Sequence, residues 1–483
     1  MSNDAYLNFI NGQWVPSDSG SLMEIRDPAT GDILHEVQDS SRADVDKAVV
    51  AAREAFENTE WRQNAELRTN ALNKLVDKLA ERQELLRDLM IKEAGKTFPV
   101  ARGEAGMIVQ TVQYYADLAR WVFGRSAQPT ADSLSILLRE PIGVVGIITP
   151  WNMPLALLVR PLAPALAAGC AVVLKPAEQT SGVTAELVKV IEEVEEIPPG
   201  IVNMVTGAGE TVGSHLAGHA DVDMISFTGG TETGREIVRL SASNLKKVSL
   251  ELGGKSPNIV FADADFDRAI QGALAGAGFW NAGQVCTAGT RLLVEESVHD
   301  NFIERIRQSV PKMKVGPGTE RVQVGPIISE SQLERVMGYI EQGKSVAELV
   351  VGGNRLTEGD LARGYFVEPT VFDNPPVDSA LAQDEIFGPV LSVIPFSDVD
   401  EAIEIANATR YGLVAAVWTK DIDKALTTSM RVKAGTVWVN TYGKLFQNIE
   451  FGGTKQSGTG RHYGLEGLLE YTELKHIHIQ LGS

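Results

Sequence analysis

"GVVGIIT", residues 143–149, begins an alternation of apolar and helical segments from which the fold class follows. Three more short apolar runs come after it: AVVLKP at 171–176, IVNMVTG at 201–207 and DMISFTGG at 223–230. Between the runs at 171–176 and 201–207, the segment TAELVKVIEEVEE at 184–196 carries apolar residues at helical spacing. Strands that alternate with helices indicate βαβ units, so we expect a parallel sheet with helices on both faces.

The same alternation starts again near residue 255. Further short apolar runs lie at 256–261, 290–296, 415–420 and 435–440. A helix is expected from about 265 to 281, directly after the first of these runs. A chain of 483 residues is also too long for one hydrophobic core. We therefore predict an α/β protein with two α/β domains.

One segment, 142–174, is apolar over a length that exceeds a membrane span. It contains Arg160 and four prolines, at positions 150, 154, 161 and 164. Prolines and a charge at this density argue against a single lipid-facing helix. We expect a buried strand, a loop, a buried helix and a second strand instead, and no membrane partner.

The chain is strongly acidic, with 44 Lys and Arg against 63 Asp and Glu and a formal net charge of −19. A negative surface argues against nucleic acid or anionic membranes as partners. The two cysteines, Cys170 and Cys286, form neither a disulfide framework nor a zinc-ligand pattern, so no metal site is predicted. The low cysteine content and an N-terminus without a secretory pattern predict a reducing, cytoplasmic compartment.

Two places at the ends of predicted strands suit a nucleotide. Gly229 and Gly230 stand at a strand-to-helix turn, where free backbone N–H groups favour a phosphate and where glycine also simply permits a tight turn. Lys175 and Glu178 end another strand, at the edge of a parallel sheet where ligands bind. A carboxylate there accepts ribose hydroxyls and repels a 2′-phosphate, which favours NAD over NADP; a solvated charge pair is the alternative interpretation.

Three residues have side chains suited to covalent catalysis. Cys286 lies in the glycine-rich stretch GFWNAGQVCTAGT at 278–290, whereas Cys170 lies in an aliphatic run typical of an inert thiol. Glu251 interrupts an apolar strand, and burial without a partner would raise its pKa towards that of a general base. Asn152, held between Trp151 and prolines, offers an amide N–H for an oxyanion hole. Each residue also has a purely structural interpretation. Cys286 could be an inert thiol, Glu251 a glutamate that faces outward from its strand, and Asn152 an asparagine whose side chain hydrogen-bonds the backbone of its own loop.

Seven motifs occur in order over nearly the whole chain. They are PWNMP (150–154), LKPAE (174–178), FTGGTETG (227–234), LELGGKS (250–256), GQVC (283–286), EIFGPV (385–390) and FGGTKQSG (451–458). In this combination the chain resembles the NAD(P)-dependent aldehyde dehydrogenase superfamily. The resemblance implies that Cys286 attacks the aldehyde and passes through a thiohemiacetal to a thioester, with Asn152 and the Cys286 N–H holding the oxyanion. It also implies that Glu251 activates the water that hydrolyses the thioester.

The resemblance further implies an NAD site, with NADP as the less favoured cofactor. The residues implied in cofactor binding are Trp151, Lys175, Glu178, Gly229, Gly230, Glu385 and Phe387. Among them, Lys175 and Glu178 would hold the adenosine ribose, and Gly230 would face the pyrophosphate. Glu385 would bind the nicotinamide-side ribose, and Phe387 would border the nicotinamide. The chain departs from common patterns at Gly230, where many members carry Ser, and at His462, where many carry Glu.

Substrate choice rests on residues that flank these motifs. The residues expected to line the aldehyde tunnel are Met153, Leu157, Arg160, Trp280, Val285, Thr287, Tyr442 and Phe446. Semialdehyde-oxidising relatives often carry a carboxylate-binding arginine at the position of Arg160, as do relatives acting on aromatic aldehydes. Trp280 stands where the semialdehyde enzymes would offer a second arginine, which favours an aromatic or apolar aldehyde. Four further interpretations stay open: a semialdehyde dehydrogenase in which Arg160 binds the carboxylate, a structural salt bridge of Arg160 outside the tunnel, a CoA-acylating enzyme and a non-catalytic protein.

The resemblance also divides the chain. Residues 1–120 and 142–252 would form a Rossmann-like NAD-binding domain, and residues 253–450 the catalytic domain. Residues 121–141 and 463–483 would form a small β arm for a homodimer or homotetramer. The sequence supports such an arm, because KHIHIQL at 475–481 alternates like an edge strand that needs a partner.

Overall fold

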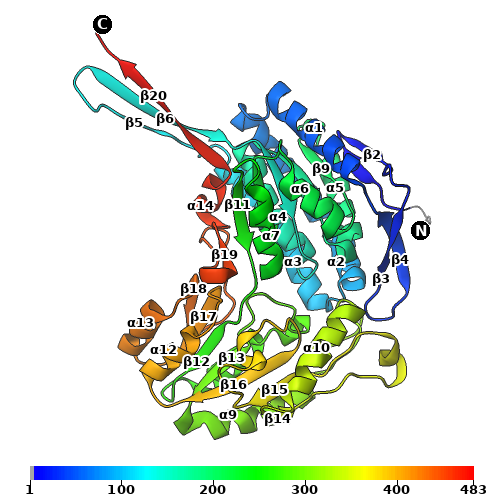
Figure 1. Cartoon of the computed structure of the whole chain (residues 1–483), viewed down its shortest axis with the longest axis vertical. Helices are drawn as coiled ribbons and strands as arrows, with labels where there is room; N and C mark the ends of the chain where they lie inside the picture. Colours follow the sequence, from blue (N-terminus) through cyan, green and yellow to red (C-terminus); the bar gives the residue numbers. More distant parts are fainter. Residues whose placement is uncertain (1–4, 483) are drawn as a thin grey trace.

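The computed structural model describes residues 5–482 and builds them mainly around two β-sheets, which lie in the upper and lower halves of Figure 1. The eight-stranded sheet has the order β19-β11-β10-β7-β8-β9-β1-β2. Its parallel centre consists of β7 (Val144–Ile148), β8 (Ala171–Lys175), β9 (Val202–Met204), β10 (Met224–Thr228) and β11 (Lys247–Glu251). These strands include the apolar runs from which the parallel sheet was predicted, so that prediction is confirmed.

Helices before and between these strands pack on the sheet and on one another. They are α1 (Arg42–Asn58), α2 (Ala65–Glu93), α3 (Phe98–Leu118), α4 (Pro154–Ala168), α5 (Ser181–Glu192), α6 (Ser214–Gly218) and α7 (Thr231–Ser241). Helix α4 packs against β7 and β8, and both α2 and α3 pack against α4. Every residue of α4 is buried, which explains its apolar composition without a membrane.

The apolar segment 142–174 folds as predicted, into β7, a loop, α4 and β8. Its first two prolines lie in the loop and at the start of α4, where a missing N–H is tolerated. Over the described residues, no helix combines the length and apolar character needed to cross a bilayer.

The second sheet has seven strands in the order β14-β15-β16-β13-β12-β17-β18. The strands are β12 (Pro257–Val260), β13 (Arg291–Glu295), β14 (Glu348–Val351), β15 (Thr370–Asp373), β16 (Val390–Phe396), β17 (Val414–Trp418) and β18 (Thr436–Val439). All neighbours are parallel except β14 and β15. The helices are α8 (Phe266–Gly276), α9 (Glu296–Ser309), α10 (Glu330–Gly343), α11 (Ala380–Gln383), α12 (Val399–Asn407) and α13 (Ile422–Arg431).

The helix predicted from about 265 to 281 is wrong in its length. Helix α8 ends at Gly276, and a separate 3-10 turn follows at Phe279–Asn281. Gly278 between them has a φ of +73°, a left-handed conformation that interrupts the helix.

A third sheet extends from the body of the molecule (Figure 1). It consists of β5 (Arg125–Ala127), β6 (Ser133–Pro141) and β20 (Thr472–Gln480), in the order β20-β6-β5. Strand β20 includes most of the predicted edge strand and pairs along its length with β6. Its other edge is unpaired within residues 5–482.

Short elements complete the chain. They are β1 (Asn8–Ile10), β2 (Gln13–Val15), β3 (Leu22–Arg26), β4 (Ile33–Gln38), β19 (Gly458–Thr459) and α14 (Gly464–Leu469). Strand β19 pairs with the end of β11, so the segment after 450 returns to the first sheet. That return brings residues 451–463 next to Glu251.

Candidate active site

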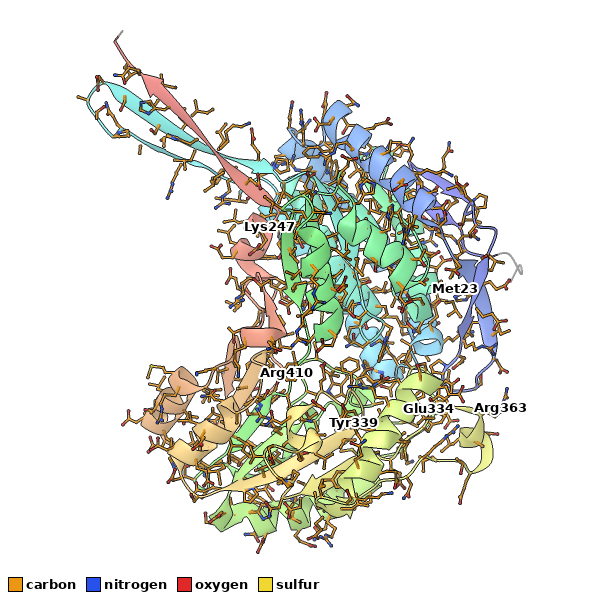
Figure 2. The ribbon with its side chains drawn as sticks, in the orientation of Figure 1. Met23, Lys247, Glu334, Tyr339, Arg363 and Arg410 are labelled. Carbon is orange, nitrogen blue, oxygen red and sulfur yellow. The ribbon has the colours of Figure 1, made fainter. Side chains whose placement is uncertain are left out.

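A cavity of about 510 Å³ lies where the two halves of the molecule meet. Its walls come from the carboxyl ends of β10 and β11, at Thr228 and Glu251, and from loops of the second half. Tyr339 and Arg410, labelled in Figure 2, are part of the wall supplied by the second half. Ligands of parallel α/β sheets bind beyond the carboxyl ends of the strands, so this cavity has the expected position of an active site.

Cys286 lines this cavity from a loop whose backbone lies very close to neighbouring segments. A Cβ added at Gly254 would lie 2.7 Å from the Cys286 carbonyl oxygen, and one at Gly283 would lie 1.9 Å from the Gly388 oxygen. The glycines around the thiol therefore serve close backbone approach. Burial raises the pKa of the Cys286 thiol to about 12, so a base must take its proton before the sulfur can attack.

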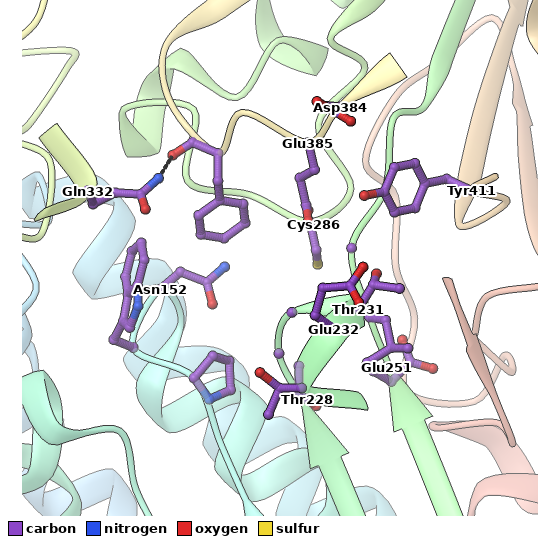
Figure 3. A pocket seen from close by; sticks show the side chains of 18 of the residues that line it. Asn152, Thr228, Thr231, Glu232, Glu251, Cys286, Gln332, Asp384, Glu385 and Tyr411 are labelled. Atoms are coloured by element: carbon purple, nitrogen blue, oxygen red, sulfur yellow. Dashed lines mark hydrogen bonds between the residues drawn. The ribbon is translucent and has the colours of Figure 1, made fainter. Parts of the chain in front are cut away.

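Asn152 is buried, and its side chain reaches toward the same space as the Cys286 thiol (Figure 3). Its Nδ2 donates one hydrogen bond to the Gln284 carbonyl oxygen at 3.0 Å. Asn281 Nδ2 donates to that same oxygen at 3.1 Å. Since an amide nitrogen carries two N–H groups, Asn152 keeps a second donor for the cavity while the first fixes its orientation.

Lys96 and Glu104 hold the Asn152 segment and were missed by the sequence reasoning. Lys96 Nζ donates to the Asn152 backbone oxygen at 2.7 Å and lies 3.0 Å from Glu104 Oε2, with both side chains fully buried. Glu104 Oε1 accepts from the backbone N–H groups of Leu155 and Ala156 in the first turn of α4. Nothing in the local sequence around either charge indicated this pair, because the contact depends on how α3 packs against α4.

Glu251 ends β11 with its side chain only 4 % exposed. Oε2 lies 3.8 Å from Arg160 Nη2, and Oε1 has no hydrogen-bond partner within residues 5–482. Burial raises the pKa of Glu251 to about 7, while the charges of Arg160 and Arg461 act in the opposite direction. A carboxyl group with this pKa is suited to exchanging protons near neutral pH.

The remaining wall of the cavity includes most of the expected cofactor residues. Trp151, Gly229, Gly230, Glu385 and Phe387 all line it. The rings of Trp151 and Phe387 meet edge to face, with their centroids 5.3 Å apart. Glu385 Oε1 accepts a hydrogen bond from the Gly254 N–H at 3.1 Å, and burial raises the pKa of this carboxyl group to about 7.

Gln332 and Arg335 on α10 are further residues that the sequence reasoning missed. Gln332 Nε2 donates to the Phe387 carbonyl oxygen at 2.9 Å, and Arg335 Nη2 donates to that of Glu385 at 2.9 Å. Phe387 has a φ of +59°, an uncommon conformation for a residue with a side chain. The two hydrogen bonds from α10 keep this loop at the rim of the cavity.

Lys175 and Glu178 lie at the end of β8, outside the wall of this cavity. Lys175 Nζ donates to Glu178 Oε1 at 2.8 Å, and the Gly209 N–H donates to the same oxygen at 2.6 Å. Although burial works in the opposite direction, these partners lower the pKa of Glu178. An ionised carboxylate therefore stands at the carboxyl edge of the sheet, one strand beyond β7.

Among the described residues expected to line the tunnel, Leu157 alone contributes to the cavity wall. Met153 precedes α4, with its sulfur 3.0 Å from Lys96 Nζ. Trp280 is 37 % exposed and donates from Nε1 to the Ala275 oxygen at 3.2 Å. Arg160 is buried and faces Glu251.

The remaining expected tunnel residues form a second group near the Cys286 loop. Val285 and Thr287 flank the nucleophile, and both are partly exposed. Tyr442 donates from its hydroxyl group to the Thr287 oxygen at 2.8 Å. Phe446 is 57 % exposed on the loop that follows β18. The structure thus brings a tyrosine and the Cys286 loop together and leaves Phe446 at the surface.

Outside the cavity, Asp46, His215 and His219 form a cluster with the residue types of a metal site. Nε2 of His215 lies 2.6 Å and Nε2 of His219 lies 3.3 Å from Asp46 Oδ1. However, the Asp221 N–H donates to His219 Nδ1 at 3.1 Å, which leaves the proton of the neutral ring on Nε2. A protonated Nε2 donates to Asp46 and is not free for a metal, so the cluster is explained by hydrogen bonds.

Comparisons with known proteins agree over nearly the whole chain. The model of the aldehyde dehydrogenase family matches residues 14–477. Betaine aldehyde dehydrogenase of Bacillus subtilis is 44 % identical over 477 residues, covering 97 % of this chain and 96 % of that protein. Aldehyde dehydrogenase 1A1 of Gallus gallus is 44 % identical over 480 residues, covering 98 % of this chain and 93 % of that protein.

Solved structures lead to the same conclusion. Betaine aldehyde dehydrogenase from Staphylococcus aureus, in complex with NAD+, superposes with a TM-score of 0.96 at 41 % identity. The match covers 98 % of this chain and 94 % of that one. The family expected from the seven motifs is therefore confirmed. This chain belongs to the aldehyde dehydrogenase family.

Proposed function

We propose that this protein is an NAD-dependent aldehyde dehydrogenase that oxidises an aldehyde to its carboxylic acid through a thioester on Cys286. The observation that carries the proposal is the convergence of Cys286, Asn152 and Glu251 on one cavity. These residues come from three separate segments and supply a nucleophile, an amide donor and a carboxyl group of pKa about 7. Family membership supports the same chemistry.

The cavity wall fits a dinucleotide. Gly230 precedes the first turn of α7, whose free N–H groups suit a phosphate. A Cβ added at Gly230 would meet no described atom within 4 Å, so there is room for a ligand at this turn. Glu385 offers a carboxylate for ribose hydroxyls beside Trp151 and Phe387. Glu178 offers a second carboxylate at the end of β8. Because a carboxylate there repels the 2′-phosphate of NADP, it supports NAD as the cofactor.

The chemistry follows from the protein groups in order. Water takes the proton of the Cys286 thiol and carries it to the solvent, and the sulfur attacks the carbonyl carbon of the aldehyde. Asn152 Nδ2 and the Cys286 N–H donate to the oxygen as its negative charge develops. When NAD is bound, its nicotinamide would supply the acceptor for the hydride of that carbon, and loss of the hydride would leave a thioester on Cys286. Glu251 then removes a proton from water as the water attacks the thioester, and the acid leaves as the Cys286 sulfur recovers a proton.

We propose an aromatic or apolar aldehyde as substrate. Arg160 faces Glu251 at 3.8 Å and is buried, which supports a role inside the protein and disfavours a carboxylate-bearing semialdehyde. Glu251 itself disfavours transfer of the thioester to CoA, because water activation needs this base. Betaine aldehyde is a second candidate, since relatives at 44 % and 41 % identity carry that name.

We also propose that the β5–β6–β20 sheet joins subunits into a homodimer or homotetramer. The outer strand β20 is exposed along most of its length. Apolar side chains on it, such as Leu474 (52 %) and Ile477 (39 %), are left in solvent. An unpaired edge strand with exposed apolar residues favours association. Light scattering after size exclusion distinguishes a dimer, a tetramer and a monomer, and a monomer would contradict this assignment.

The first test is NADH formation by the purified protein with a panel of aldehydes. The panel contains benzaldehyde, an aliphatic series, succinic semialdehyde and betaine aldehyde. Highest kcat/KM on the aromatic or aliphatic members supports the proposed substrate class. A preference for succinic semialdehyde would instead assign Arg160 to the substrate, and a preference for betaine aldehyde would select the second candidate. No NADH with any member would contradict the proposed activity.

A further inference from the structure

We propose that Arg160 is a positioning residue for Glu251, which it holds as a carboxylate beneath the cavity, and that it does not anchor the substrate. The inference rests on the proposed function, because it assigns Glu251 the part of the base. Arg160 is the group that controls when that base is ionised.

Arg160 lies on the buried helix α4 and is 3 % exposed. Its Nη2 lies 3.8 Å from Glu251 Oε2 and donates to Thr228 Oγ1 at 3.4 Å. The guanidinium carbon lies 5.7 Å from the centroid of the Phe451 ring and 6.0 Å from that of Tyr463. Two aromatic rings and a hydroxyl group thus direct the cation toward the end of β11.

Glu251 is the one carboxylate in the described chain that forms an ion pair with Arg160. The titratable groups that face Glu251 or Arg160 from the surrounding elements are Tyr115, Cys286, Arg461, His462, Tyr463 and Tyr471. Burial and the charge of Arg160 lower the pKa of His462 well below its usual value, so this ring is neutral at pH 7. Burial raises the pKa of the three tyrosines and of the Cys286 thiol, which keeps them protonated.

The pair has an electrostatic consequence. A buried carboxyl group without a cation nearby is protonated at neutral pH, because desolvation penalises the charged form. The charge of Arg160 opposes that desolvation and lowers the pKa of Glu251. Arg461 acts in the same direction, but it is partly exposed, and its Nη1 is engaged by the Gly453 and Gly460 oxygens. Arg160 is therefore the main reason that Glu251 is ionised often enough to act as a base at pH 7.

The surroundings also determine where the carboxylate lies. A Cβ added at Gly452 would lie 3.0 Å from Glu251 Oε1, so this glycine leaves the space that the carboxylate occupies. Within residues 5–482, Arg160 does not contribute to the cavity wall. A substrate carboxylate would have to displace Glu251 from the same guanidinium to reach it. The geometry thus favours a support behind the base over a contact with substrate.

The test compares the pH dependence of kcat for the wild type, Arg160→Gln and Arg160→Lys, with benzaldehyde and saturating NAD. We expect the acid limb to move up by about one pH unit in Arg160→Gln, so that kcat at pH 6 falls about tenfold. Arg160→Lys keeps the charge and should restore at least half of the shift. KM for benzaldehyde should not change. An unchanged acid limb in Arg160→Gln, or a loss confined to KM, would overturn the proposal.

Arg68→Gln is the matched control for loss of a buried arginine. Arg68 is 5 % exposed and donates to the backbone oxygens of Trp61 and Ala167. Its removal should lower thermal stability without moving the acid limb. Glu251→Gln, measured alongside, separates the base assignment from the inference about Arg160. If its steady turnover equals that of the wild type, the base assignment fails, whereas a slow Glu251→Gln with an unshifted Arg160→Gln overturns only the inference about Arg160.

A double variant covers the case in which Arg160→Gln does not fold. Removing one partner of a buried pair leaves an uncompensated charge, whereas removing both does not. Arg160→Gln/Glu251→Gln should therefore recover folded protein and a higher melting temperature at pH 8 than Arg160→Gln alone. A double variant that is no more stable than the single one would show that the two charges are not coupled and would overturn the proposal.

Discussion

Lys96 Nζ donates to the backbone oxygen of Asn152 at 2.7 Å, across 56 positions of sequence and with both residues buried. The same ammonium group lies 3.0 Å from Glu104 Oε2, and Glu104 in turn accepts hydrogen bonds from the first turn of α4. A buried ion pair thus supports the backbone of the residue whose amide faces the nucleophile. The position of that amide depends on charges that do not themselves line the cavity.

Lys96→Met should lower kcat by about 10- to 100-fold, because a small displacement of the Asn152 amide weakens the stabilisation of the oxyanion. NAD affinity should be unchanged. Steady-state kinetics and NAD titration measure the two effects. The control is Lys96→Met/Glu104→Gln, which removes the unpaired carboxylate and should recover melting temperature without recovering kcat. A wild-type kcat in Lys96→Met would contradict the role of this pair.

Cys286→Ala should abolish NADH formation while NAD binding is retained, because only the nucleophile is lost. Absorbance at the NADH band and NAD titration by fluorescence measure the two properties. Cys170→Ala is the matched control: Cys170 is fully buried, and its thiol donates to the Tyr471 oxygen at 3.4 Å. We expect Cys170→Ala to keep its activity. Residual NADH formation in Cys286→Ala would mean that another group attacks the aldehyde.

Glu251→Gln should still release a burst of NADH and then turn over slowly, because the thioester lacks a base to activate water. In the wild type, burial raises the pKa of Glu251 to about 7. A base must be ionised, so the steady rate should fall as the pH drops through about 7 and level off above it. Stopped-flow absorbance over a series of pH values measures both phases. A rate without an acid limb in that range would exclude Glu251 as the base.

Gly230→Ser should tighten NAD binding by about fivefold, which corresponds to one added hydrogen bond of about 1 kcal/mol. A Cβ at this position meets no described atom within 4 Å, and the backbone φ of −71° suits any residue. The serine therefore fits without strain and places a hydroxyl group beside the start of α7. Titration calorimetry with NAD measures the change. Weaker binding would show that the phosphates do not lie at this turn.

Local patterns were sufficient for much of the fold. The four apolar runs between 143 and 230 became β7, β8, β9 and β10, because alternating buried strands and amphipathic helices are a property of short segments. The helix predicted over 265–281 was too long, since its apolar spacing continues past the point where Gly278 takes a positive φ. A conformational break of this kind depends on how the loop before Cys286 packs.

Motifs identified Cys286, Asn152 and Glu251 as candidates, and the structure gathers them around one cavity. The residues of the substrate tunnel stay a prediction. Of the tunnel residues expected within 5–482, Leu157 alone lines the cavity. Side chains that flank a motif point into a tunnel or away from it according to packing, which sequence spacing does not encode.

From the order of amino acids alone, the family, the alternation of strands and helices and the residue types of the chemistry could be inferred, because each is carried by a short contiguous segment. The packing of distant segments decided the rest. Arg160 on α4 and Glu251 on β11 are 91 positions apart (251 − 160), and they meet only because the sheet and α4 bury both charges together. In a low-dielectric interior such a meeting determines which groups are ionised. The electrostatic state of Glu251, the proposed base, is therefore a property of the tertiary structure.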